Sequence, residues 1–288
     1  SAAEFAVVGD FDPNQVKSFL TELFAGWKSA QPFARLASSY RDLPGIRESI
    51  ETPDKESAVF SAGMHIDMRD DAPEYPAMVL GNFMTGGGFL NSRLAPRIRV
   101  KDGLSYGVGS FFSASPFDKD ASFGAFAICA PQNADKLVVA FDEEIAKILD
   151  KGFTAEEIAE AKKGWLQNRK VSRATDRELA RTLAGREYLK RTLSWDEALE
   201  TKVGALTNEP ILAAMKIRGL SAYDILTVDG AHAMSSNVSD IGRRHKGLGG
   251  GNLRAAVFGV SDGLVSNTSL LMGVAGAAVS NNAMITTG

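Results

Sequence analysis

The distribution of charged residues changes near residue 217. This change indicates that the residues before and after it do not belong to one fold. Residues 1–217 alternate between strand-like and helix-like patterns, with charged residues throughout. Residues 218–288 have few acidic groups and are rich in Gly, Ser, Asn and Ala. They include a run of 26 residues without any charge, Gly263 to Gly288. The sequence therefore predicts two pieces with separate structures.

The bulk composition is that of an ordinary globular protein. The chain has 288 residues, enough for one large or two modest domains, and 44% of them are hydrophobic. The formal net charge of -3 gives no overall field that would recruit nucleic acid. The single cysteine, Cys129, lies in the apolar run FGAFAICAP and is expected to be a buried core residue. One cysteine also excludes an internal disulfide.

The first piece opens with a short strand pattern followed by a helix pattern. Phe5 to Val8 reads as a buried strand, Asp12 as a helix N-cap and Pro13 as the first helical residue. Gly26 is expected to help end this helix. Its apolar face has 3- and 4-residue spacing and consists of Val16, Phe19, Leu20, Leu23, Phe24 and Trp27. Residues 29–56, with three prolines and mixed polar residues, read as a connector.

A second unit follows, with strands and helices in alternation. Strands are expected at 57–66, 104–113 and 121–130, the last two joined by a turn around Pro116–Asp120. Helices are expected at 73–84, 132–151, 155–170, 175–191 and 195–204. Thr154 and Glu157 form a capping box for the third of these helices. The pattern predicts an α+β fold, a mostly antiparallel sheet with helices packed on one face, followed by a Gly/Ala/Ser-rich apolar helical tail.

The stretch MTGGGFLNSRLAPRIRVKDGLSYGVGSFF, residues 84–112, is the most informative for function. Three glycines in a row, Gly86, Gly87 and Gly88, are costly in a regular element and suit a hinge or a close backbone approach. Three arginines follow: Arg93, Arg97 and Arg99. One interpretation is a Gly-rich turn before a helix with a solvated basic face. A phosphate-binding loop is excluded because the G-x-x-x-x-G-K-[ST] pattern is absent.

The segment GGGFLNSRLAPRIRVKDGLSYGVGS resembles the pitrilysin/insulysin-type zinc peptidases, an inverted-zincin family that includes mitochondrial processing peptidases. It is most similar to long bacterial members with four homologous units. The resemblance extends over roughly residues 1–216, including VVGDFD at 7–12 and GFTAEEIAEAK at 152–162. It implies that residues 1–45 end a preceding peptidase-type unit, and that residues 46–217 form the C-terminal-type domain that lacks zinc.

In this family an Arg and a Tyr seven residues apart reach from a non-zinc unit to the zinc site, and Arg99 and Tyr106 match them. The resemblance implies that both bind the substrate backbone and stabilise the tetrahedral intermediate, behind the turn at Gly86–Gly88. The chemistry suits this role, since Arg offers a fixed fork of donors and a phenol donates to a developing oxyanion. The alternative for Tyr106 is a strand residue packed on the sheet.

The zinc-binding motif of the family, H-x-x-E-H, is absent. The chain has three histidines, His65, His232 and His245, and none has another His four residues away. His65 reads as an ordinary strand-end histidine. Two carboxylate pairs, Asp70–Asp71 and Glu143–Glu144, read as solvated surface. We therefore expect no zinc on this chain and no peptidase activity of the chain alone, with Zn²⁺ carried by a unit upstream or on a separate chain.

The tail carries a second resemblance. LRAAVFGVSDGLVSNTSLLMGVAGA, residues 253–277, is similar to the first membrane helix of the vacuolar iron transporter family, with RRHKGLGGG as its lead-in. Its length suffices for a membrane span of about 20 residues, and the basic residues before it fit a cytoplasmic side. The resemblance would place Asp262 on the metal path. The alternative is a mildly apolar helix packed on a soluble domain, and one span is too few for transport.

These two resemblances do not belong to one known protein type. After residue 217 the family would continue with a closing strand, for which Asp224–Val228 is a poor substitute, so we expect a linker over 218–252, a membrane-like helix over 253–280 and a truncated end over 281–288. We hypothesise a fusion or sequence join within 217–233, with Met234 as a native start.

The expected function is peptide-substrate binding without catalysis; the alternative is a membrane-anchored interaction domain or a transporter remnant. The peptidase resemblance implies the periplasm, and an inserted tail the membrane.

Overall fold

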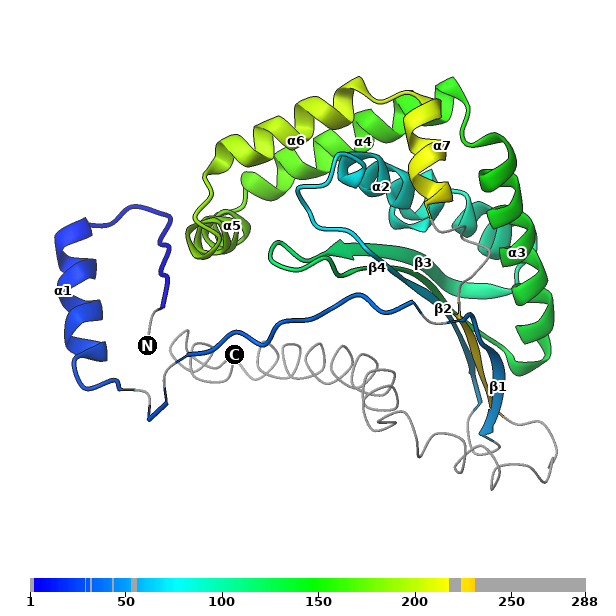
Figure 1. Ribbon diagram of the computed structural model, residues 1–288, viewed down its shortest axis with the longest axis horizontal. Helices are drawn as coiled ribbons and strands as arrows, with labels where there is room; N and C mark the ends of the chain where they lie inside the picture. Colours follow the sequence, from blue (N-terminus) through cyan, green and yellow to red (C-terminus); the bar gives the residue numbers. More distant parts are fainter. Residues whose placement is uncertain are drawn as a thin grey trace. The chain divides into compact units, whose positions relative to one another are not determined.

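The computed structural model describes residues 3–28, 30–31, 33–42, 44–52, 56–217 and 224–230, the last of these by backbone alone (Figure 1). The strands are β1 (Arg47–Thr52), β2 (Ala58–Ile66), β3 (Ser105–Ala114), β4 (Ala121–Cys129) and β5 (Asp224–Gly230). The helices are α1 (Pro13–Phe24), α2 (Tyr75–Asn82), α3 (Ala134–Lys151), α4 (Ala155–Arg173), α5 (Asp176–Tyr188), α6 (Leu193–Ala205) and α7 (Asn208–Lys216). Shorter helical segments are η1 (Phe83–Gly87), η2 (Phe89–Asn91), η3 (Ala95–Lys101) and η4 (Pro131–Asn133).

The strands form one sheet in the order β1-β5-β2-β4-β3. The pairs β2–β5, β2–β4 and β4–β3 are antiparallel, and β1 pairs with β5 in parallel. The α+β fold with a mostly antiparallel sheet is therefore confirmed for the described residues. Two local predictions were wrong: the connector expected over 29–56 contains β1, and β5 lies within the linker expected over 218–252. The closing strand that the peptidase family would have after residue 217 is thus present as β5, which pairs with both β1 and β2.

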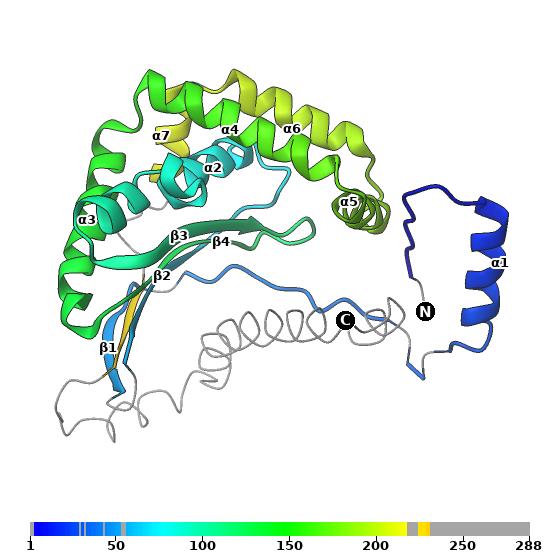
Figure 2. The same ribbon diagram turned by 180° about the vertical axis from the view of Figure 1, so that it is seen from behind.

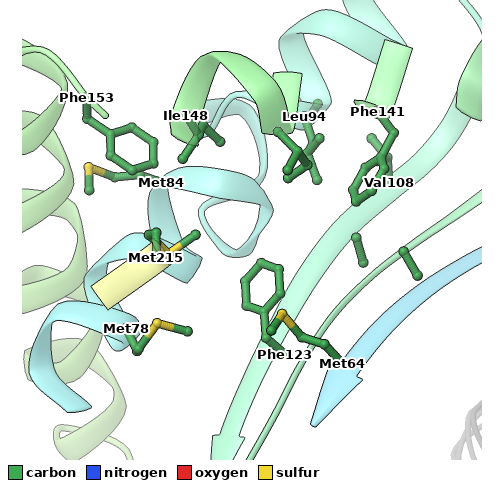
Figure 3. Close-up of a cluster of buried hydrophobic side chains, with 14 of the residues drawn as sticks. Met64, Met78, Met84, Leu94, Val108, Phe123, Phe141, Ile148, Phe153 and Met215 are labelled. Atoms are coloured by element: carbon green, nitrogen blue, oxygen red, sulfur yellow. The ribbon is translucent and has the colours of Figure 1, made fainter. Parts of the chain in front are cut away.

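One face of the sheet is covered by helices, as Figures 1 and 2 show from opposite sides. Alternate residues of β2 and β4 point into this layer, among them Phe60, Ile66 and Phe123, each 1–2% exposed. They pack with Phe141 of α3 and the methionines of α2 and α7 (Figure 3). The predicted burial of Cys129 is confirmed. Period-two alternation on the strands and the apolar stripes of the helices account for this core.

On the opposite face of the sheet, the outward positions of the paired strands are mostly glycine, serine and aromatic residues. Phe111 of β3 lies opposite Gly124 of β4, and Phe126 of β4 lies opposite Gly109 of β3. Phe111 and Phe126 are 47% and 46% exposed. Each ring lies over the glycine of the neighbouring strand, where an added Cβ would meet it. Glycine at these two positions therefore makes room for the two rings.

The N-terminal segment confirms its predicted cap but not its predicted strand. The Asp12 carboxylate accepts a hydrogen bond from the Asn14 N–H at 2.7 Å, and Pro13 opens α1. Residues 5–8 form no strand, since no described strand pairs with them. None of the residues of α1 is buried, and Phe19 is 63% exposed. The apolar stripe of α1 is thus present but only partly covered, since the Phe5 ring lies 5.1 Å from the Phe24 ring while no residue of the helix is buried.

Helices α4, α5 and α6 are joined by ion pairs around one buried carboxylate. Asp196 of α6 is 2% exposed and accepts hydrogen bonds from Arg186 of α5 and from Arg169 of α4. Burial alone would raise the pKa of Asp196, but the two arginines outweigh it and the pKa lies below its ordinary value. Glu200, one turn further along α6, accepts from Arg169 at 2.7 Å and from Arg173. This group of charges holds the three helices together.

One of the predicted surface carboxylates belongs to the same region. Asp70 is only 8% exposed and accepts hydrogen bonds from both terminal nitrogens of Arg191, at 2.5 and 2.8 Å. The guanidinium groups of Arg186 and Arg191 lie over the ring of Trp195, at 4.4 and 4.8 Å. The prediction of a solvated Asp70–Asp71 pair is therefore wrong for Asp70, which is buried and forms an ion pair with Arg191, 121 positions further along the chain.

None of the helices in the described ranges combines the length and the apolar character that a membrane span requires. The predicted membrane helix, residues 253–280, lies outside those ranges.

Candidate functional site

The candidate site is the segment from Phe83 to Tyr106, which leads from α2 into β3. The helix expected over 73–84 is present as α2 and continues past residue 84 as the π-helical turn η1, which ends within the glycine run at Gly87. A β-carbon on Gly86 would lie 2.6 Å from the backbone nitrogen of Ser110 in β3. The segment can therefore approach β3 only with glycine at this position. π-Helical turns are rare and occur often at functional sites.

Replacing Gly86 by Ala is expected to destabilise the chain by about 1–3 kcal/mol, the usual cost of overpacking. The obstacle is backbone, which cannot rotate away as a side chain would. Gly185 in α5 is the control, because an added β-carbon there meets nothing within 4 Å. Gly185→Ala should stabilise by about 0.5–1 kcal/mol through helix propensity. Urea unfolding followed by circular dichroism measures both, and equal effects would contradict the assigned close approach.

Arg93, the first arginine of the segment, is anchored to α4. Its Nε and Nη2 donate to the two carboxylate oxygens of Glu157 at 2.7 and 2.8 Å. Nη2 also donates to the Gly152 carbonyl at 3.1 Å, and the guanidinium lies 5.1 Å from the centre of the Phe153 ring. Burial raises the pKa of Glu157, but the hydrogen bonds from Arg93 and from the Thr154 N–H outweigh it and the pKa is lowered. The predicted capping box of Thr154 and Glu157 is present in full.

Arg97, the second arginine, is also held by carboxylates. It pairs with Asp102 and, at 2.7 Å, with Glu143 of α3. Its Nε lies 3.6 Å from Glu144, which is 7% exposed and also pairs with Lys147. The interpretation of a solvated basic face is therefore wrong for Arg93 and Arg97. The prediction of a solvated carboxylate pair is wrong for Glu144.

Arg99 has a different environment. It is exposed, and among the described residues no carboxylate pairs with it. Its guanidinium lies 5.1 Å from the centre of the Phe89 ring. All of its N–H donors are therefore free of carboxylate partners in the part of the chain that the structure describes. A planar fork of donors in this state suits recognition of carbonyl or carboxylate oxygens.

Tyr106 lies at an irregularity at the start of β3. Ser105 pairs with Cys129 and Gly107 with Ile128, which leaves Tyr106 as the additional residue of a β-bulge. The Ser105 hydroxyl lies 2.6 Å from the Ile128 carbonyl oxygen and accepts from the Gly107 N–H at 3.1 Å. Tyr106 is 67% exposed, which does not favour the alternative of a residue packed on the sheet. Bulges commonly redirect a side chain in this way beside functional sites.

The described residues contain no group of His, Cys, Asp and Glu side chains that could hold a metal ion. His65 lies on β2 with its Nδ1 3.6 Å from Asp120. His232, His245 and Asp262 lie outside the described residues. The residues described here therefore offer no set of zinc ligands.

The family model described as the Peptidase M16 inactive domain matches residues 1–164, more than half of the chain. The chain belongs to this family. The match agrees with the resemblance to the zinc peptidases and covers the whole segment from Gly86 to Tyr106. A second model, that of the VIT family, matches residues 253–288.

Curated relatives are similar at lower coverage. The chain is 27% identical over 165 residues to the non-peptidase homolog YmxG of Helicobacter pylori, covering 57% of this chain and 37% of the relative. It is 26% identical over 193 residues to the uncharacterized zinc protease SCO5738 of Streptomyces coelicolor, covering 65% and 40%. The chain thus spans about two fifths of the length of these relatives.

Solved structures show the same fold. A peptidase M16 inactive domain from Pseudomonas fluorescens superposes with a TM-score of 0.65 at 23% identity, over 80% of this chain and 54% of that chain. The periplasmic protease PqqL from Escherichia coli superposes with a TM-score of 0.57 at 22% identity, over 77% and 24%. At these identities the superpositions establish the fold alone.

Sequence reasoning missed Phe89 and the carboxylates that hold Arg93 and Arg97. Glu157 and Glu143 lie 64 and 46 positions away from their arginines, and spacing alone does not reveal such pairs. The one available signal was the position of Phe89 directly after Gly86–Gly88, where a bulky residue is unexpected beside a tight backbone approach.

Proposed function

We propose that this chain is the non-catalytic, substrate-binding portion of a zinc peptidase and that it acts only together with a zinc-bearing unit. The observation that carries the proposal is the division of the arginines of the site. Arg93 and Arg97 are occupied by carboxylates, whereas Arg99 lies on the surface and pairs with no carboxylate of the described residues. A structural role explains the first two and leaves Arg99 available for a ligand.

In this proposal Arg99 and Tyr106 bind the backbone of a peptide substrate. The guanidinium fork donates to a carbonyl oxygen, and the phenol donates a further hydrogen bond to the oxygen on which negative charge develops. Donors fixed in advance are most effective in this role because they need no reorganisation during the reaction. Gly86 contributes by letting the backbone that leads to Arg99 lie against β3, while Gly87 and Gly88 lie close to Asn82 and Phe83 at the end of the preceding helix.

The zinc ion belongs to the partner unit in this proposal. That unit either precedes this segment in a longer protein or is a separate chain, and it supplies H-x-x-E-H and the water-activating chemistry of the metal. The names of the relatives support a division of labour, because one is called a zinc protease and the other a non-peptidase homolog. Peptide binding by this chain without hydrolysis is compatible with both.

The chain alone is expected to hydrolyse no peptide, with or without added Zn²⁺. Mixed with the zinc-bearing unit, or joined to it in one protein, it should restore peptidase activity, because the site then contains both the metal and the donors. Cleavage of an unfolded protein followed by mass spectrometry measures this. The control is a partner unit with Glu→Gln in its H-x-x-E-H motif. Zinc-dependent hydrolysis by this chain alone would overturn the proposal.

A second function, membrane anchoring of an interaction domain, is supported only by the match of residues 253–288 to the VIT family. Asp262 on a metal path and a membrane contact through residues 253–280 belong to this proposal. Recovery of the chain in the membrane fraction, lost when residues 253–280 are deleted, would distinguish it from the peptidase role.

A further inference from the structure

Phe89 has a backbone conformation that a bulky side chain rarely adopts. Its φ is 52°, in the left-handed region, and it directly follows Gly88, whose φ is -85°. For an aromatic residue this conformation costs free energy and persists only where the surroundings impose it. A glycine at this position would avoid the cost. The presence of phenylalanine instead therefore points to a role for its ring.

The surroundings do impose this conformation. The Phe89 carbonyl accepts hydrogen bonds from the Ser92 N–H at 3.1 Å and from the Ser92 hydroxyl. On either side, the Asn91 N–H donates to the Gly88 carbonyl at 3.1 Å, and the Arg93 N–H donates to the Met84 carbonyl at 2.9 Å. Since Arg93 is itself anchored to Glu157, the turn at Phe89 is fixed from both ends.

The strained conformation does not serve burial of the ring. Phe89 is 43% exposed and is not part of the core. Its ring lies 5.1 Å from the Arg99 guanidinium. Arg93 has both a ring and a carboxylate, whereas Arg99 has the ring alone among the described residues. The contact with Arg99 is therefore what the position of this ring provides.

A ring suits this purpose better than a carboxylate. Attraction between a cation and an aromatic face holds the plane of a guanidinium without using its N–H donors. A carboxylate would occupy the same fork that has to meet the substrate. A ring therefore restricts the orientation of an arginine and leaves its hydrogen-bonding capacity for a ligand.

We propose that Phe89 is a positioning residue for Arg99, which its ring holds in the orientation that meets the substrate. This inference rests on the proposed role of Arg99. Phe89 itself touches no reacting atom in this proposal, and its effect passes through the guanidinium.

The contact is tested first on the full chain by NMR of the Arg99 side chain, with the resonance assigned by its loss in Arg99→Lys. Ring-current effects should shift the Arg99 Nε–H signal when Phe89 is replaced by Leu, which keeps apolar bulk but removes the ring. Phe126→Leu is the control, since Phe126 has similar exposure, 46%, and lies over Gly109 with no arginine of the described ranges over its ring. An unchanged Arg99 signal in Phe89→Leu would overturn the proposal.

The role is tested by kinetics of the complete enzyme, with the zinc-bearing unit present. Phe89→Leu should lower kcat about 2- to 5-fold with little change in KM, and Phe89→Trp should retain the wild-type kcat because its ring also holds a cation. In an Arg99→Ala background, Phe89→Leu should have no further effect. Equal losses of kcat in the wild-type and Arg99→Ala backgrounds would contradict the positioning role. If Arg99→Ala leaves kcat unchanged, the proposed function fails, while the NMR shift still reports whether the contact exists.

Discussion

Replacing Arg99 by Ala in the complete enzyme should lower kcat on the order of 10²–10³-fold, the usual loss when one preorganised donor to a developing oxyanion is removed. The substitution should leave the fold intact, because Arg99 is exposed and makes no ion pair among the described residues. Steady-state kinetics with a peptide substrate, together with a melting curve of each variant, separates the two effects. A loss in kcat without a loss in stability is the expected result.

Tyr106→Phe gives the companion measurement. It removes only the hydroxyl of a side chain that is 67% exposed, so the fold should again be unaffected while kcat falls. Lys101→Ala is the matched control, because Lys101 is an exposed cation on the same η3 segment. Its loss should change kcat less than about 2-fold, since exposed charges contribute little. If Lys101→Ala matches Arg99→Ala, general positive charge rather than directed hydrogen bonding explains the effect.

The parts of the fold that the sequence predicted are those with local signals. The Thr154–Glu157 capping box, the Asp12 cap and the apolar patterns of β2 and β4 were sufficient to predict α4, α1 and the two strands. What failed depended on distant partners. β5 was hidden because its pairing to β1 and β2 spans more than 150 residues, and the strand at 5–8 failed because none of the described strands pairs with it.

The candidate site shows the same division. Arg99 and Tyr106 were predicted from a resemblance in motif, and the structure leaves both exposed as a binding role needs. The sequence could not separate Arg99 from Arg93 and Arg97, because only packing against α3 and α4 decides which arginine meets a carboxylate. The role of Phe89 was harder to predict, since its position directly after three glycines hints at an unusual backbone but does not show that its ring meets Arg99.

Asp196→Ala should cost about 3–5 kcal/mol of stability, the usual result of removing one partner from a buried ion pair. Asp196 is 2% exposed, and its loss leaves the Arg186 guanidinium with no carboxylate partner in the part of the chain that the structure describes. Arg169 keeps Glu200, which places the expected cost toward the lower end of the range. Guanidinium unfolding followed by far-UV circular dichroism measures it. Asp71→Ala is the control, because Asp71 pairs with Arg69 on the surface and should cost less than about 1 kcal/mol.

The charge of Asp196 should also make the free energy of unfolding depend on pH. The pKa of Asp196 is lower in the folded protein than the ordinary value of an aspartate. The ionised carboxylate therefore makes its full contribution to stability above about pH 4, and this contribution is lost as the pH falls through the pKa of the folded state. Glu200 acts in the same direction, since hydrogen bonds from Arg173 and Arg169 lower its pKa. The free energy of unfolding should therefore fall with pH below about pH 4 in the wild type and less steeply in Asp196→Ala. Parallel curves for the two proteins would show that Asp196 stabilises the helices by packing rather than by its charge.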